Sequence, residues 1–486
     1  MPQSRSRIRW HQPSLPATER FTIRTATAPA PVTEREAVRQ MILRVGIPVV
    51  EGAETAKEFA IGLLKLAAEV EHALMVQYLY AAFSLPDDEE SSELYRRRLL
   101  SIATQEMGHL TTVQNVLLLL GGRDAFYMQR DLLREESEKN PIPFVLEPVS
   151  KASLAKYVAA EKPAQVPPDL VAKVDELVEL AEHDSGVDTH RVGVIFELLK
   201  WIFTPPGAAP GSIDFSSYAP LPAKPHITDE DLQDNLIAVP KYEALRDEWD
   251  VHVEHIILEP VRTISEARNI LDEIARQGEG LTNGGPSHFT EFMAIVAAFE
   301  AGLISVKSMP KAPTLRDDET GELISHPYTR LWVEVFNAQY NLLILAIYHA
   351  LVTARPNDGS PGLRASLANI SLDSMRTVIQ PLADLISALP LNAEGGPAKA
   401  GPSFALDHSI LNSNVEADLV AQHIRVLDDL KTLYTAIESS LDFDSFPSHA
   451  ITLANLRNTD RTRRKLFPAP TPAPTNDTQP TGEVTT

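Results

Sequence analysis

Two long helical segments joined by a short acidic turn constrain the fold of this chain more than any other feature. The first is expected from about Ala53 to Ser84 and the second from about Ser91 to Leu120, with the turn centred near Asp88. Apolar residues recur at helical spacing in the first segment, and a proline followed by two aspartates ends it. A short connection favours an antiparallel hairpin. Residues equally far from Asp88 then lie level with each other on the two helices.

This hairpin brings an acid on one helix opposite an acid and an imidazole on the other. Glu71 lies 17 residues before Asp88, and Glu106 lies 18 residues after it. His109 follows Glu106 by three positions, so these two side chains share one helix face. A Glu from one helix with a Glu-x-x-His pair from the next is half of the ligand set that binds two metal ions inside a four-helix bundle. The alternative is an exposed helix face that carries ordinary charges.

Further helices are expected along the rest of the chain, separated by loops rich in proline and glycine. They cover about residues 36–46, 154–160, 168–203 with a break near 184–186, 262–276, 287–301, 328–353, 363–388 and 415–440. Residues 205–240 are expected to form a loop-like insertion. No segment of any length alternates between apolar and polar residues as a strand would. The sequence therefore predicts an all-α fold, with a four-helix bundle core, additional packed helices and long loops.

Composition along the chain suggests four regions. Residues 1–35 are rich in Arg, Ser, Thr and Pro and are predicted to be a disordered tail. Residues 36–405 form the helical domain with its insertions, and 406–465 form a C-terminal helical extension. Residues 466–486 consist largely of Pro and Thr and are predicted to be a second disordered tail.

Charge and cysteine usage exclude several classes of function. The formal net charge is −22, from 66 acids against 44 Lys and Arg, and such a surface repels nucleic acid and anionic lipid. The chain has no cysteine, so a bound metal must use His, Asp or Glu. The apolar run Leu342 to Val352 is too short to span a membrane, and the N-terminus lacks the apolar core of a secretory signal. A cytoplasmic location and a small-molecule substrate are therefore expected, with no nucleic-acid or membrane partner.

Short motifs spread over residues 55–405 carry a family resemblance. They include Leu66 to Ala73, Gln105 to Leu110, Tyr157 to Pro163, His190 to Phe196, Gln277 to Gly280, Ser287 to Phe289 and Ala400 to Phe404. Taken together, these motifs resemble the ferritin-like family that includes the iminophenyl-pyruvate dimer synthase domain of bisindole pigment pathways. The resemblance implies a ferritin-like four-helix bundle that holds a non-haem di-metal centre, either di-iron or manganese.

The resemblance also implies which residues bind the metals. Glu71, Glu106 and His109 match the family motifs most directly. Glu279 and His288 come next, because one ends a helix, the other begins the next, and the glycine-rich turn between them could aim both inward. Their alternative roles are a surface acid at a helix C-terminus and a capping histidine at a helix N-terminus.

The third helix departs from the family pattern. Family members often have an acid directly after the glycine of this motif, where this chain has Val194. Glu197 lies three residues after Val194 and His190 four residues before it, so both share roughly its helical face. Glu197 is predicted to be a bridging or terminal metal ligand, with a simple surface acid as the alternative, and His190 is a further candidate. The departure leaves open whether one or two metals bind.

Two further groups of residues have both a functional and a structural interpretation. Tyr78 and Tyr80 could be redox-active near a metal, although aromatic residues on bundle helices usually belong to the core. His252 and His255 have a spacing that can hold a metal, but they lie in an acidic stretch that resembles a solvated face.

The function that the resemblance implies is a metal-dependent oxidoreductase. It would use dioxygen or peroxide on a small amino-acid-derived metabolite, in secondary metabolism. An alternative is a ferritin-like binding or scaffold protein with an incomplete or idle metal site, which the valine at position 194 favours. A third is a peroxide-consuming or iron-handling protein. A homo-oligomer is left open, and no general acid or base is assigned because several carboxylates could serve.

Overall fold

The predicted hairpin forms, and its sequence explains where each helix begins and ends. The computed structural model describes residues 7–13, 33–130, 142, 144–185, 192–206, 213–249, 255–279, 287–358 and 362–467. In this structure, α3 (Ala56–Phe83) lies antiparallel to α4 (Glu90–Gly121). Thr55 and Glu58 form a capping box at the start of α3. Gly122 follows α4 with a φ of 66°, a conformation that glycine adopts without strain.

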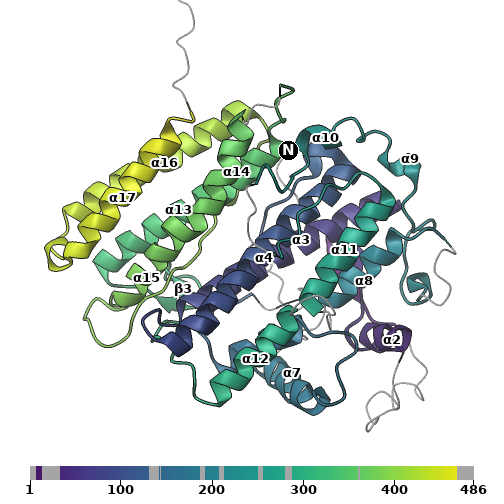
Figure 1. Cartoon of the computed structure of the whole chain (residues 1–486), viewed down its shortest axis with the longest axis horizontal. Coiled ribbons are helices and arrows are strands. Elements are labelled where there is room, and N and C mark those ends of the chain that lie inside the picture. The colour runs from purple at the N-terminus through teal and green to yellow at the C-terminus, as the bar shows by residue number, and fades with distance from the viewer. Residues whose placement is uncertain are drawn as a thin grey trace, which may run out of the picture.

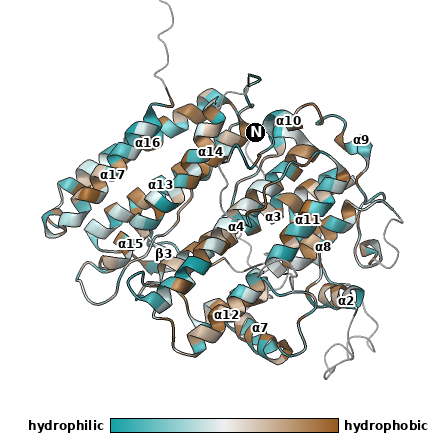
Figure 2. Cartoon of the chain, in the orientation of Figure 1, coloured by the Kyte–Doolittle hydropathy of each residue, from teal (hydrophilic) through white to brown (hydrophobic). Residues whose placement is uncertain are grey.

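Two more helices close the four-helix bundle (Figure 1). The bundle consists of α3, α4, α8 (Val192–Ile202) and α11 (Ile264–Glu279). Each of these helices packs against two neighbours, in the order α3, α4, α11, α8 and back to α3. Hydrophilic and hydrophobic residues alternate along α11 (Figure 2), as expected for an amphipathic helix that buries one face. The structure thus confirms the all-α prediction with a bundle core.

Three helices pack around one part of the bundle. They are α6 (Lys151–Ala160), α7 (Val171–Ser185) and α12 (His288–Glu300). Helix α6 packs against both α7 and α12, and α12 also contacts α4 and α11. As a result, the C-terminal end of α6 and the N-terminal end of α12 meet beside the hairpin.

The C-terminal half packs around one long apolar helix, α13 (Pro327–Val352). Within the described part of the chain, α13 is the helix long and apolar enough to cross a membrane, but 89% of its apolar window is buried inside the protein. Its position is therefore that of a core helix. Its neighbours are α14 (Gly362–Ser374), α15 (Gln380–Ala388), α16 (Glu416–Glu438) and α17 (Pro447–Arg464).

Two details of this half differ from the sequence prediction. The single helix expected at 363–388 is interrupted by a π-helical turn, Met375–Ile379. Pro381 lies two residues after this turn, and its ring and missing N–H are incompatible with a regular helical hydrogen bond at that position. Helix α17 lies within the predicted C-terminal helical extension but was not expected as a separate helix, because its buried residues include His449, Asp460 and Arg463 and so give it no clear apolar stripe.

The remaining elements are short. Strand β1 (Ile8–His11) pairs antiparallel with β2 (Ile47–Val50), next to α2 (Glu34–Val45), and β3 (Pro313–Thr314) pairs parallel with β4 (Glu322–Leu323). Residues 8–11 fall in the segment expected to be a tail, so that part of the prediction is corrected. The 205–240 insertion contains η3 (Phe215–Ser217), α9 (Asp229–Leu232) and α10 (Val239–Tyr242), and further 3₁₀ turns are η1 (Gly122–Ala125), η5 (His408–Leu411) and η6 (Phe443–Ser445).

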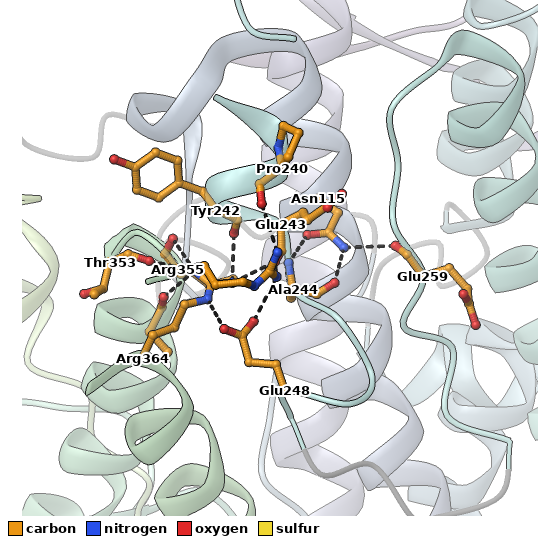
Figure 3. Close-up of polar contacts among 12 residues, drawn as sticks. Asn115, Pro240, Tyr242, Glu243, Ala244, Glu248, Glu259, Thr353, Arg355 and Arg364 are labelled. Carbon is orange, nitrogen blue, oxygen red and sulfur yellow. Dashed lines mark hydrogen bonds and ion pairs between the residues drawn. The ribbon is translucent and has the colours of Figure 1, made fainter. Parts of the chain in front are cut away.

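Buried polar contacts fix the segment between α10 and α11 to the helices around it (Figure 3). The Arg364 side chain donates to the carbonyl of Glu243 at 2.8 Å and forms an ion pair with Glu248 at 2.7 Å. The Asn115 side chain, on α4, donates to the carbonyls of Ala244 and Glu259 at 2.9 and 3.0 Å. Both ends of this segment are therefore held against the hairpin.

Two histidines lie buried where α13 packs against α16. His349 and His423 have ring centroids 5.3 Å apart, and the Phe467 ring stacks 4.5 Å from His423. Burial lowers the pKa of His349 to about 4. Burial, with His349 and Arg463 nearby, lowers the pKa of His423 well below its ordinary value. Both rings must therefore be neutral in the folded protein.

This pair predicts that the protein loses stability on acidification. Below the ordinary histidine pKa of about 6.5 the unfolded chain binds protons that the folded His349 does not, so stability falls as the pH falls toward about 4. The His349 contribution between about pH 7.5 and pH 5 is about 2 kcal/mol. His349→Leu should reduce the pH dependence of urea unfolding by that amount. Parallel stability curves for the wild type and the variant would contradict this explanation.

Candidate metal centre

Three carboxylates and two imidazoles converge at the place where the hairpin meets α6 and α12. Glu71 comes from α3, and Glu106 and His109 come from α4. Glu161 is the residue directly after α6, and His288 is the first residue of α12. All five side chains are buried. They form two overlapping groups, Glu71 with Glu106 and His109, and Glu106 with Glu161 and His288, whose candidate ligand atoms lie within 4.8 Å of one another.

Glu106 lies between the two imidazoles. Its Oε2 is 2.9 Å from Nδ1 of His109, and its Oε1 is 3.0 Å from Nδ1 of His288. Glu71 Oε2 lies 3.4 Å from the same His109 nitrogen, and Glu161 Oε1 lies 3.7 Å from the His288 nitrogen. Each half of the cluster thus has one carboxylate of its own and shares Glu106.

Two glutamine side chains lie at the nitrogen of each imidazole that points away from the carboxylates. Nε2 of His109 lies 2.8 Å from Oε1 of Gln277, and Nε2 of His288 lies 3.1 Å from Oε1 of Gln105. An amide oxygen only accepts hydrogen bonds, so Nε2 of each ring carries the hydrogen and donates. The Nδ1 atoms therefore face the carboxylate oxygens, and a proton or a cation must lie between these electron-rich atoms.

The donor set fits metal ions. Glu106 Oε1 and His288 Nδ1 are buried and have no hydrogen-bond partner, although only 3.0 Å separates them. Metal-binding histidines commonly donate their other ring N–H to an acceptor, as both histidines do here. Mixed carboxylate and imidazole ligands suit iron or manganese. Glu71 with His109 would hold one ion, Glu161 with His288 would hold the second, and Glu106 would bridge them.

The electrostatics of the cluster favour protons when no metal is bound. Burial, followed by the nearby Glu106, raises the pKa of Glu71 to about 8. Burial alone would raise the pKa of Glu106, but His288 and His109 lower it below its ordinary value. Burial opposes protonation of the two histidines, yet contacts with the carboxylates raise the pKa of His109 and bring that of His288 to about 9. A metal must therefore displace protons.

Two motif glycines make room for this arrangement. A Cβ atom at Gly278, on α11, would lie 2.8 Å from Glu161 Oε2, so a larger residue there would force that carboxylate to move. A Cβ atom at Gly108, on α4, would lie 2.7 Å from the Ile256 side chain. Glycine at that position lets the segment before α11 pack directly onto the helix that carries Glu106 and His109.

The two tyrosines considered from the sequence have different surroundings. The Tyr78 hydroxyl donates to Glu161 Oε1 at 2.5 Å, and its ring packs 4.9 Å from that of Tyr157. Tyr80 instead donates to the carbonyl of Pro310 at 2.6 Å. Tyr78 therefore supports the cluster directly, whereas Tyr80 fixes a loop elsewhere.

The structure brings four of the predicted ligands together and places another elsewhere. Glu71, Glu106, His109 and His288 share the cluster. Glu197 does not join it: its carboxylate pairs with Lys200 at 2.5 Å, and its side chain is 28% exposed. Val194 is fully buried, so the face of α8 that points into the core is apolar and Glu197 lies at its edge. We therefore leave Glu197 out of the candidate site.

Two predicted ligands fall outside the described residues. They are His190 and the side chain of Glu279, whose backbone ends α11. His252, of the weaker histidine pair, also lies outside the described residues.

Glu161 was not predicted as a ligand. Its place in the Tyr157 to Pro163 motif was the only sign of it in the sequence. Its position in the cluster depends on how α6 packs against α12, which no local sequence pattern predicts.

Comparison with known proteins agrees with this architecture. Residues 64–205 match the family model described as Ferritin-like, and this stretch contains Glu71, Glu106, His109 and Glu161. Residues 64–205 therefore form a ferritin-like domain, and two relatives of the iminophenyl-pyruvate dimer synthase type agree with the resemblance seen in the sequence.

The first relative is dichlorochromopyrrolate synthase of Lentzea aerocolonigenes, 26% identical over 419 residues. The match covers 75% of this chain and 38% of that protein. The second is the 2-imino-3-(indol-3-yl)propanoate dimerase of Chromobacterium violaceum, 32% identical over 132 residues. This match covers 21% of this chain and 13% of the dimerase. The chain thus spans well under half the length of these relatives. No solved structure matches it.

The contact between Gly278 and Glu161 predicts a selective effect of Gly278→Ala. Alanine favours a helix over glycine by up to about 1 kcal/mol, so thermal stability should be unchanged or slightly higher. The added methyl group should displace Glu161 and weaken binding of one ion by about 10- to 100-fold, a loss typical of disturbed ligand support. Titration of the metal-free protein with Mn²⁺ measures this loss. Unchanged affinity would show that Glu161 can move without cost.

The protons held by the cluster predict a pH dependence of metal binding. The pKa of Glu71 is about 8 and that of His288 about 9, so both carry a proton at neutral pH when no metal is bound. For each displaced proton, the affinity for Mn²⁺ should rise about tenfold per pH unit at pH values below these pKa values. Calorimetry in buffers of different ionisation enthalpy counts the released protons. Affinity independent of pH between about 6 and 8 would contradict this assignment.

Proposed function

We propose that this protein is a metal-dependent oxidoreductase with two non-haem iron or manganese ions in the bundle. It would use dioxygen or peroxide to oxidise a small amino-acid-derived metabolite, in a pathway of secondary metabolism. The observation that carries this proposal is the buried cluster of three carboxylates and two imidazoles, in which two ligand groups share Glu106. Burying five titratable groups is costly unless they bind something that offsets their charge.

The names of the relatives support the substrate class. One relative is named as a synthase of dichlorochromopyrrolate, and the other as a dimerase of 2-imino-3-(indol-3-yl)propanoate. The second name describes an imino acid with the carbon skeleton of tryptophan. We propose that an imino acid of this kind is the substrate. We also propose that the protein acts in the cytoplasm, in line with its lack of cysteine.

The residues of the cluster have distinct roles in this proposal. Metal ions with carboxylate and imidazole ligands supply oxidation of a bound organic molecule by dioxygen or peroxide. Glu71, Glu106 and His109 would hold one ion, and Glu106, Glu161 and His288 would hold the other. The Tyr78 hydroxyl holds Glu161 in place and keeps a proton at its Oε1. Burial of all five ligands keeps bulk water away from the reacting groups.

A scaffold with an idle metal site is the second candidate, favoured by the buried Val194 where family members often carry an acid. Glu161 weakens that argument, because it brings a third carboxylate into the cluster from outside the four bundle helices. Metal content separates the two candidates.

Substitutions of single carboxylates should remove metals in a defined pattern. Protein purified without added metal should contain about two iron or manganese ions per chain, as elemental analysis would measure. Glu106→Gln should lose both ions, because its carboxylate is shared, whereas Glu71→Gln and Glu161→Gln should each retain one. Helix content should stay nearly unchanged by circular dichroism.

Glu197→Gln is the matched control for this series. Its carboxylate pairs with Lys200 and lies outside the cluster, so the variant should retain both ions. Loss of an ion from Glu197→Gln would restore the ligand role predicted from the sequence. No metal in the wild type, and no uptake on reconstitution, would support the idle scaffold.

Activity can be tested with the proposed substrate class. An amino-acid oxidase acting on tryptophan generates the imino acid and hydrogen peroxide in the same vessel. The iron-loaded protein should consume oxidant and convert the imino acid to a new product, and Glu106→Gln should not. Consumption of oxidant without any change in the imino acid would instead favour a peroxide-consuming protein.

A further inference from the structure

Gln277 contacts both the candidate metal centre and a neighbouring loop. Its Oε1 accepts from Nε2 of His109 at 2.8 Å, and its Nε2 donates to the carbonyl of His255 at 2.7 Å. Both ends of this amide group are therefore used. Gln277 is half-buried on α11, so its role cannot be explained as filling the core.

The loop that holds Gln277 is packed directly on the helix that carries His109. Residues 255–259, which we call the strap, lie along α4. The Ile256 side chain fills the space above Gly108, the Thr112 hydroxyl donates to the carbonyl of Ile257 at 2.8 Å, and Asn115 donates to the carbonyl of Glu259 at 3.0 Å. The strap is thus fixed to α4 at three points within two helical turns of His109.

The backbone of the strap is strained at the residue that contacts Gln277. His255 has a φ of 70°, in the left-handed region that residues other than glycine rarely adopt. Such a conformation is strained and persists only where surrounding contacts hold it. The carbonyl that accepts from Gln277 belongs to this residue.

We infer that Gln277 is a positioning residue for His109, and that the strap fixes its orientation through the His255 carbonyl. This inference rests on the proposed function, in which His109 binds a metal through Nδ1. With its oxygen toward the ring, Gln277 keeps the hydrogen on Nε2 and leaves the Nδ1 lone pair facing Glu71 and Glu106.

The opposite orientation of the amide would disable His109 as a ligand. A flipped Gln277 would present its NH₂ group to Nε2, which would then have to accept, and the ring hydrogen would move to Nδ1 where the metal binds. The flip would also bring the Gln277 oxygen against the His255 carbonyl, and two acceptors facing each other repel. The strap therefore selects the orientation that metal binding needs.

Mn²⁺ titration of metal-free variants, followed by the electron paramagnetic resonance of free Mn²⁺, tests this inference in a double-mutant cycle. Gln277→Leu should weaken Mn²⁺ binding by about 10- to 100-fold in the wild-type background. In a His109→Ala background the same substitution should change the affinity by less than about twofold, because a positioning residue acts through its partner. In a His288→Ala background the full loss should remain.

Gln277→Glu is the conservative variant. Its carboxylate still accepts from His109 Nε2, but its second oxygen faces the His255 carbonyl and is repelled, so it should recover only part of the affinity that Gln277→Leu loses. Equal losses for Gln277→Leu in all three backgrounds would show a structural role and overturn the inference, as would no loss at all. Metal binding by the wild type would in that case still stand. A wild type that binds no Mn²⁺ would overturn both this inference and the proposed function.

Discussion

The structure depends on one electrostatic arrangement, a carboxylate buried between two imidazoles. An isolated ionised carboxylate in an apolar interior costs on the order of tens of kcal/mol, so Glu106 can exist at this position only with positive charge close by. His109 and His288 lie on its two sides, at 2.9 and 3.0 Å. Every other polar group of the cluster is arranged around this contact. Tyr78 donates to Glu161, and Gln105 and Gln277 accept from the imidazoles.

The ligands come from two kinds of structural element, which explains why the outer helices matter. Glu71, Glu106 and His109 project from the middle of long bundle helices, where the backbone is rigid. Glu161 and His288 lie at the ends of helices that pack outside the bundle. Helix α6 is anchored by Lys156, which pairs with Glu147 at 2.6 Å and with Asp184 at 2.5 Å in a largely buried network. The second half of the cluster thus depends on the packing of α6, α7 and α12.

The sequence predicted what a single hairpin determines and missed what depends on packing between distant segments. The spacing of Glu71 and Glu106 about Asp88 is a property of two helices and a turn, and it correctly placed both acids and His109 together. Glu161 reaches the cluster only because α6 packs against α12, and no local pattern encodes that contact. Glu197 shares a helical face with Val194 only approximately, and a modest rotation is enough to move a carboxylate from the core to its edge. Helix α17 buries charged residues in a polar network and therefore lacks the apolar period by which helices are recognised.

The motifs Gln105 to Leu110 and Gln277 to Gly280 each contain a glutamine and a glycine, and the two residue types have the same tasks in both motifs. The glutamine orients an imidazole, and the glycine allows another segment to approach closely. Gln105 on α4 accepts from His288, which belongs to α12, whereas Gln277 on α11 accepts from His109, which belongs to α4. Each helix thus orients an imidazole that another helix presents. The glycines allow close packing at the same places: the strap packs against Gly108, and the Glu161 carboxylate lies against Gly278. His288 therefore takes its orientation when α12 packs on α4, and His109 takes its orientation when α11 packs on α4. The geometry of the cluster is therefore a property of the assembled helices.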